Sequence, residues 1–135
     1  TPFVASFIGS MNFIENAVRT EAGLYQIGDH RLQVHGDNGA SGFGEGSRAV
    51  LAIRPEDVMI GPNGGTDPNT LKGRVEGMEY RGPVFRVGFR LPLGDGRDIR
   101  IESEVPTEKI RRLSVREEME IPVRFPTDRL RVYAA

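Results

Sequence analysis

The sequence predicts an all-β protein. Glycine occurs 17 times and proline 9 times among 135 residues, which favours many tight turns. Apolar and polar residues alternate over short runs, as they do in strands with one buried face. Beyond residue 10, only one short segment has the spacing of a helix. These observations together predict short strands joined by turns, with a single short helix.

The N-terminal part is expected to hold several short strands and no helix beyond residue 10. We expect strands at 11–19, 24–27 and 31–34, with a hairpin turn between the last two. The glycine-rich segment 36–47 is predicted to be an exposed loop. It precedes a strand, whereas a phosphate-binding loop must follow a strand and open a helix.

The strand at 49–53 ends at a charged corner, Arg54-Pro55-Glu56. Nearly every position before Arg54 is apolar, which is typical of a strand covered on both faces. Pro55 cannot donate a ladder hydrogen bond and keeps Arg54 extended, so we expect Arg54 to pair with Glu56 or a nearby carbonyl. The triplet is interpreted first as a structural corner and second as a docking site. Arg54→Ala should then cost ~1–3 kcal/mol, and Pro55→Ala less.

The segment 61–69 is rich in proline and glycine and is the expected boundary between two parts. Beyond it, Gly73 and Gly77 would permit a bulge in the first strand. The expected elements are strands at 70–80, 83–91 and 98–105, a helix start at 106–107 with one or two helical turns over 108–113, and strands at 118–125 and 130–133.

Three strands, a helix and two strands follow the order of an oligonucleotide/oligosaccharide-binding (OB) barrel. We therefore predict an OB-type small β-barrel at 69–135 and a second, less regular OB-like half-barrel at 11–68. Residues 1–10 form a junction that precedes both.

Composition excludes several classes of function. There is no cysteine, so disulfides are excluded and a reducing compartment is expected. No apolar run approaches the ~20 residues that a transmembrane helix needs. The net charge of −1 argues against general nucleic-acid binding.

The sequence shows neither the motif needed for nucleotide hydrolysis nor the ligand spacing of a metal centre. A phosphate loop would end in Gly-Lys-Ser/Thr, but Lys72 and Lys109 stand in other contexts. His30 and His35 have an odd spacing that places them on opposite sides of a strand, so no metal site is expected. We expect no catalytic residue and no cofactor in this chain.

Two further patterns have both a structural and a functional interpretation. Glu102 and Glu104 share a strand face, but Arg100 and neighbouring arginines favour an ion-paired surface over an acid–base pair. Tyr80 is the one aromatic side chain expected to point outward beside arginines, where a base could stack.

Three segments resemble one protein family. Residues 3–10 and the following Met11-Asn12-Phe13 resemble the junction at which the ATPase domain of bacterial ABC importer subunits meets a C-terminal regulatory domain. Residues 51–58 resemble the "IRPED" segment of that domain, and residues 125–133 resemble its closing strand. The order and spacing of the three segments match the family over essentially the whole chain.

The resemblance implies a regulatory and dimerisation domain that supports ATP-driven uptake without catalysis of its own. Residues 1–10 would be the end of an ATPase domain, the chain a fragment of a longer subunit, and ATP and magnesium would bind in the ATPase domain. The implied partners are a second copy in a homodimer, the ATPase domain and, indirectly, the membrane subunits. The implied location is the cytoplasmic face of the membrane.

An alternative interpretation is an OB-fold ligand-binding module for an oxyanion or single-stranded nucleic acid. Some barrels of the family bind molybdate between protomers. The serine-rich motif expected for that resemblance is missing from residues 70–76. The transported substrate is not decided by the sequence.

Overall fold

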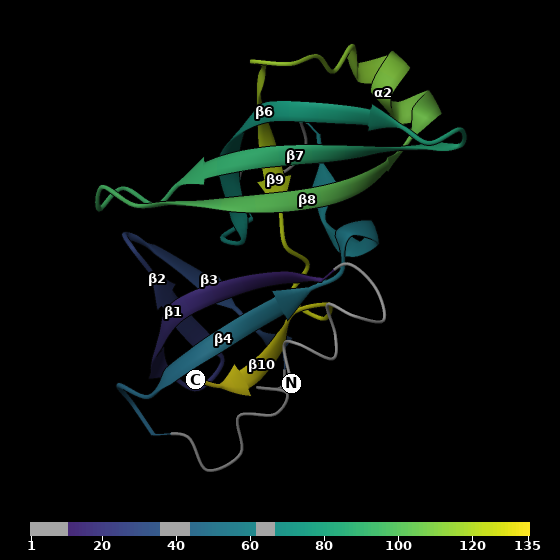
Figure 1. Ribbon diagram of the computed structural model, residues 1–135. Coiled ribbons are helices and arrows are strands. Elements are labelled where there is room, and N and C mark those ends of the chain that lie inside the picture. Colours follow the sequence, from purple (N-terminus) through teal and green to yellow (C-terminus); the bar gives the residue numbers. More distant parts are fainter. Residues whose placement is uncertain (1–10, 36–43, 62–66) are drawn as a thin grey trace.

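The structure is a computed structural model that describes residues 11–35, 44–61 and 67–135. It contains two five-stranded antiparallel sheets, one below the other in Figure 1. The expected all-β class is confirmed. The expectations for residues 1–10 and for most of the glycine-rich loop lie outside the described residues. Within those residues, no helix combines the length and hydrophobicity that a bilayer crossing would require.

The first sheet has the strand order β10-β4-β1-β2-β3. Strand β1 has a bulge between Ile14 and Ala17, where Asn16 adopts a positive φ of 61°. Because of this bulge, Ile14 and Ala17, three residues apart, both enter the core. The strands of this sheet are β1 (Asn12–Glu21), β2 (Leu24–Ile27), β3 (His30–Gln33), β4 (Arg48–Ile53) and β10 (Arg131–Ala134).

The second sheet has the order β5-β9-β6-β7-β8. Its strands are β5 (Met59–Ile60), β6 (Thr70–Tyr80), β7 (Val84–Pro92), β8 (Asp98–Pro106) and β9 (Glu120–Arg124). The helix α2 (Thr107–Leu113) lies between β8 and β9, as expected. The register of β6 shifts between Val75 and Gly77, where the sequence predicted a bulge.

The sheets exchange strands across the boundary expected at residue 68. Strand β5 pairs with β9 in the second sheet, and β10 pairs with β4 in the first. The last strand was expected to close the second barrel. The alternation of its residues predicts a strand but does not specify which sheet the strand joins. That choice depends on contacts distant in the sequence, because Val132 pairs with the buried Leu51.

One apolar core extends through both sheets. Tyr25 and Leu51 from the first sheet and Phe89 and Val123 from the second are all inaccessible to solvent and belong to a single cluster. Each fully buried side chain of this kind contributes roughly 1.5–3 kcal/mol, so the shared cluster favours one rigid body over two independent halves.

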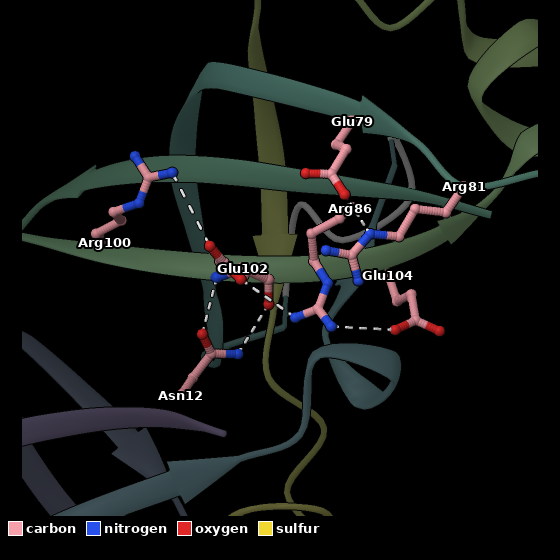
Figure 2. A network of polar contacts seen from close by, with 7 residues as sticks. All are labelled: Asn12, Glu79, Arg81, Arg86, Arg100, Glu102 and Glu104. Carbon is pink, nitrogen blue, oxygen red and sulfur yellow. Dashed lines mark hydrogen bonds and ion pairs between the residues drawn. The ribbon is translucent and has the colours of Figure 1, made fainter. Parts of the chain in front are cut away.

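Two asparagine side chains also join the halves. Fully buried Asn69, just before β6, pairs with both backbone groups of Gln33 at 2.7 and 2.8 Å and donates to the carbonyl of Phe125 at 2.8 Å. Asn12 of β1 pairs in the same way with both backbone groups of Glu102, each at 2.8 Å (Figure 2). Since β3 and β8 are sheet edges, each amide satisfies an edge strand of the other sheet.

The turn between β2 and β3 forms a third link. The Asp29 N–H donates to the carbonyl of Leu93 at 2.8 Å. Gly28 has a φ of 59°, and a Cβ there would lie 2.5 Å from the Cβ of Leu93. The close approach therefore requires glycine at this turn.

Candidate functional site

The Arg54-Pro55-Glu56 corner carries the chain from the first sheet to the second. Arg54 is extended, with φ −74° and ψ 146°, and residues Pro55–Asp57 form one turn of 3-10 helix, η2. Pro55 is buried, whereas Arg54 and Glu56 are exposed. The N–H of Asp57 donates to the carbonyl of Arg54 at 3.0 Å. Backbone bonds and the buried proline ring therefore hold this corner.

The expected pairing of Arg54 with Glu56 is wrong. Among the described residues, no hydrogen bond or ion pair joins the side chain of Arg54 to Glu56 or to a carbonyl. The expectation assumed an extended backbone, in which alternate side chains share a side. In a helical turn, residues two apart do not face each other. The docking role of the triplet stays a prediction.

A cavity of about 350 Å³ opens beside the corner. It is lined by residues from all three segments that carried the family resemblance. Met11 comes from the first segment and Ile53, Arg54 and Asp57 from the second, while the third contributes Asp128, Arg129, Arg131 and Tyr133. Sequence reasoning singled out Arg54 but missed Arg129 and Arg131, because the pairing of β10 with β4 brings them to the same place.

A second polar feature covers the outer face of β6, β7 and β8. Arg86 lies between Glu102 and Glu104, at 3.1 and 3.5 Å, and its side chain is 13% exposed (Figure 2). The Nη2 atom of Arg100 lies 4.0 Å from Glu102. The expected ion-paired surface at Glu102 and Glu104 is confirmed.

Glu76 connects this network to the neighbouring strands. It accepts a hydrogen bond from Arg90 at 2.6 Å and another from Arg100 at 2.9 Å. The bond from Arg90 is the main cause that lowers the pKa of the Glu76 carboxyl below its ordinary value. A carboxylate held in this way is a poor general acid near neutral pH. The carboxylates of this face are therefore held in ion pairs and do not form a free acid–base pair.

Glycine makes room for one member of the network. A Cβ on Gly88 would lie 2.5 Å from Nη2 of Arg100 and 3.0 Å from its Cζ. The absence of a side chain at Gly88 lets the guanidinium lie across β7 and reach Glu76 on β6.

Tyr80 points outward, as expected, and is 64% exposed. Its ring packs edge-on against Phe85, with ring centroids 5.3 Å apart. The neighbouring Arg81 is bound to Glu79 at 2.5 Å, and Arg86 and Arg90 are also paired with carboxylates. This surface lacks the unpaired positive charge that a single-stranded nucleic acid would need.

The described residues contain no group of three or more histidine, cysteine, aspartate or glutamate side chains arranged to hold a metal ion. His30 begins β3 and His35 follows its end.

Comparison with known proteins identifies the family. The TOBE domain family matches residues 51–132. The sulfate/thiosulfate import ATP-binding protein CysA 2 of Chromobacterium violaceum is 31% identical over 131 residues, covering 97% of this chain and 34% of that protein. The Fe(3+) ions import ATP-binding protein FbpC 2 of Rhizobium meliloti is 28% identical over 152 residues, covering 99% and 35%. The spermidine/putrescine import ATP-binding protein PotA of Trichodesmium erythraeum is 31% identical over 108 residues, covering 70% and 27%.

The chain thus spans about a third of the length of these curated relatives. Among solved structures, the cytoplasmic molybdate-binding protein ModG matches with a TM-score of 0.70 and 15% identity, over 92% of this chain and 96% of that chain. This similarity shows the fold and confirms the OB-type prediction. The family match covers more than half of the residues and includes segment 51–58 and nearly all of segment 125–133, two of the three segments that carried the resemblance. The chain therefore belongs to the TOBE domain family, of the kind that forms the regulatory domain in ATP-binding subunits of bacterial ABC importers.

Proposed function

We propose that this chain is the regulatory and dimerisation domain of the ATP-binding subunit of an ABC importer. The observation that carries the proposal is that the three relatives above are all ATP-binding subunits of importers, two of which align over 97% and 99% of this chain. The domain would support solute uptake without catalysis of its own. The ion-paired carboxylates on the outer sheet face agree with a non-catalytic role.

The proposed mechanism is mechanical. Two copies that stay paired would keep their ATPase domains at high effective concentration when those domains separate. The shared core and the two asparagine links make the domain a stiff unit. A movement at one side of the domain would therefore be passed to its other side. Its partners would be a second copy, the ATPase domain of the same subunit and, through it, the membrane subunits. The complex would then lie at the cytoplasmic face of the membrane.

Sedimentation of the purified chain over a range of concentrations tests the dimer. We expect a reversible dimer of the 14.9 kDa chain, and a monomer throughout the micromolar range would contradict the proposal. Magnesium-dependent ATP hydrolysis that is lost on mutation within this chain would contradict the non-catalytic role.

Oxyanion binding is a second candidate function. It is favoured by the fold similarity to ModG, whose structure contains molybdate. Strand β6 lacks the serine-rich motif expected for such a site, so an anion would have to bind elsewhere in this chain. Calorimetric titration with molybdate tests whether this chain binds the same anion as ModG. We expect no saturable binding at β6.

A further inference from the structure

We propose that the cavity beside the corner binds a phosphate ion through Arg54, Arg129 and Arg131. The proposal deepens the second candidate function, oxyanion binding, by naming a site and a ligand. It does not depend on dimerisation.

The fold gathers three arginines that are far apart in the sequence. Arg54 follows β4, Arg129 lies in the turn before β10, and Arg131 begins β10. Arg131 of β10 pairs with Ala52 of β4, and Ala52 lies two residues before Arg54 in the sequence. All three line the same cavity of about 350 Å³, near the lower end of the range for small-ligand sites.

These arginines differ from those on the outer sheet face because they have no carboxylate partner. Within the described ranges, no ion pair or side-chain hydrogen bond engages Arg54, Arg129 or Arg131. Arg86 and Arg90, in contrast, each contact two carboxylates. A guanidinium carries five N–H donors in a planar fork that matches the oxygens of phosphate. Three unpaired guanidinium groups around one cavity therefore provide donors and positive charge for an oxyanion.

Two carboxylates in the lining of the cavity select among oxyanions. Asp57 and Asp128 also line the cavity, so three cationic and two anionic side chains give its lining a net charge of +1. A carboxylate repels sulfate, which has no proton near neutral pH. Hydrogen phosphate can donate its O–H to a carboxylate while its other oxygens accept from arginine. The mixture of charges therefore favours hydrogen phosphate over sulfate.

The same argument separates free phosphate from phosphate carried on a small molecule. At about pH 8 a phosphomonoester has lost its last proton, because its second pKa is near 6. Hydrogen phosphate keeps one proton at that pH. Free phosphate should bind more tightly than glycerol phosphate there, and the difference should shrink as the pH falls toward 6.

Calorimetric titrations and thermal melts at constant ionic strength test the site, with inorganic phosphate, sulfate, glycerol phosphate and chloride as probes. We expect saturable binding of phosphate that raises Tm. Arg54→Gln and Arg131→Gln should each weaken it by about tenfold or more, because each removes charged hydrogen-bond donors. Arg116→Gln is the matched control, since Arg116 is exposed and does not line the cavity. The Tm values of all three variants without phosphate should stay close to the wild type.

A second pair of variants tests the selectivity. Asp57→Asn and Asp128→Asn remove the repulsion, so sulfate should bind these variants more nearly as tightly as phosphate does. Saturable phosphate binding that survives both arginine variants would overturn the site but leave oxyanion binding standing. Absence of saturable binding of both phosphate and sulfate would overturn both, whereas an equal loss in Arg116→Gln would overturn the site alone. Preference of the wild type for sulfate would overturn the assignment to phosphate.

Discussion

Replacing Asn69 tests whether one buried amide holds the two sheets together. Its side chain makes three hydrogen bonds, two with Gln33 on β3 and one with the carbonyl of Phe125 after β9. Asn69 is completely inaccessible to solvent, so water does not reach these groups in the folded protein. Asn69→Ala would leave one N–H and two carbonyl groups without partners.

The magnitude follows from the number of groups left unpaired. A buried polar group that loses its partner costs ~1–3 kcal/mol, and some recovery by water entry is expected. Asn69→Ala should therefore reduce the free energy of unfolding by ~3–5 kcal/mol, and Tm by about 10 °C or more. Asn12→Ala is the natural comparison, because Asn12 makes two equivalent bonds with Glu102 and is 7% exposed. It should cost less.

Urea unfolding and thermal melts of these variants measure the effect. Asn69→Asp adds a pH-dependent test, because a buried carboxylate would face the two carbonyl oxygens. Burial raises the pKa of this carboxyl in the folded state above its unfolded value. The variant should therefore be most stable at acidic pH and lose stability as the pH rises through the raised pKa. A melt of Asn69→Ala within 2–3 °C of the wild type, a shift that corresponds to about 1 kcal/mol, would refute the reasoning.

Three further predictions concern the second sheet. Gly73→Ala would place a Cβ 2.7 Å from a methyl group of Val123 in the core and should reduce the free energy of unfolding by ~1–3 kcal/mol. The Cβ of Gly88→Ala would meet only the flexible end of the Arg100 side chain, so this variant should lose less than ~1 kcal/mol. Urea unfolding compares the two variants. Because the folded pKa of Glu76 is lowered, its contribution to stability is present near neutral pH and is lost as the pH falls below about 4.5, so Glu76→Gln should flatten the acid limb of the stability curve. A single-stranded oligonucleotide should show no salt-sensitive anisotropy change with this chain at micromolar concentration.

Local patterns were sufficient to predict most of the individual elements. Strand β6 was expected with its observed bounds, and α2 was expected between β8 and β9. Alternation in β7 placed Val87, Phe89 and Leu91 in the core, where they are fully buried. These features depend on side chains a few residues apart, so the local sequence is sufficient to predict them.

The features that position the site depend on partners distant in the sequence. No local pattern distinguishes Asn12 or Asn69 from an asparagine in a turn, yet their hydrogen bonds span 90 and 36 residues. The exchange of β5 and β10 between the sheets has the same origin, and it is this exchange that brings Arg131 to Arg54. The family motifs were the one signal that could have pointed to the cavity, because each of the three segments contributes to its wall.

The structure reverses the expected effects of two substitutions at the corner. The side chain of Arg54 is exposed and makes no ion pair among the described residues, so Arg54→Ala should cost less than ~1 kcal/mol and shift Tm by no more than 2–3 °C. Pro55 is buried, and alanine there would lose packing and loosen the unfolded chain, so Pro55→Ala should cost ~1–2 kcal/mol. Thermal melts and sedimentation on both variants separate the corner from the docking role. A melt of Arg54→Ala lowered as much as that of Pro55→Ala would show that Arg54 has a structural partner after all. An unchanged melt with a weaker dimer would instead place Arg54 at the interface between copies.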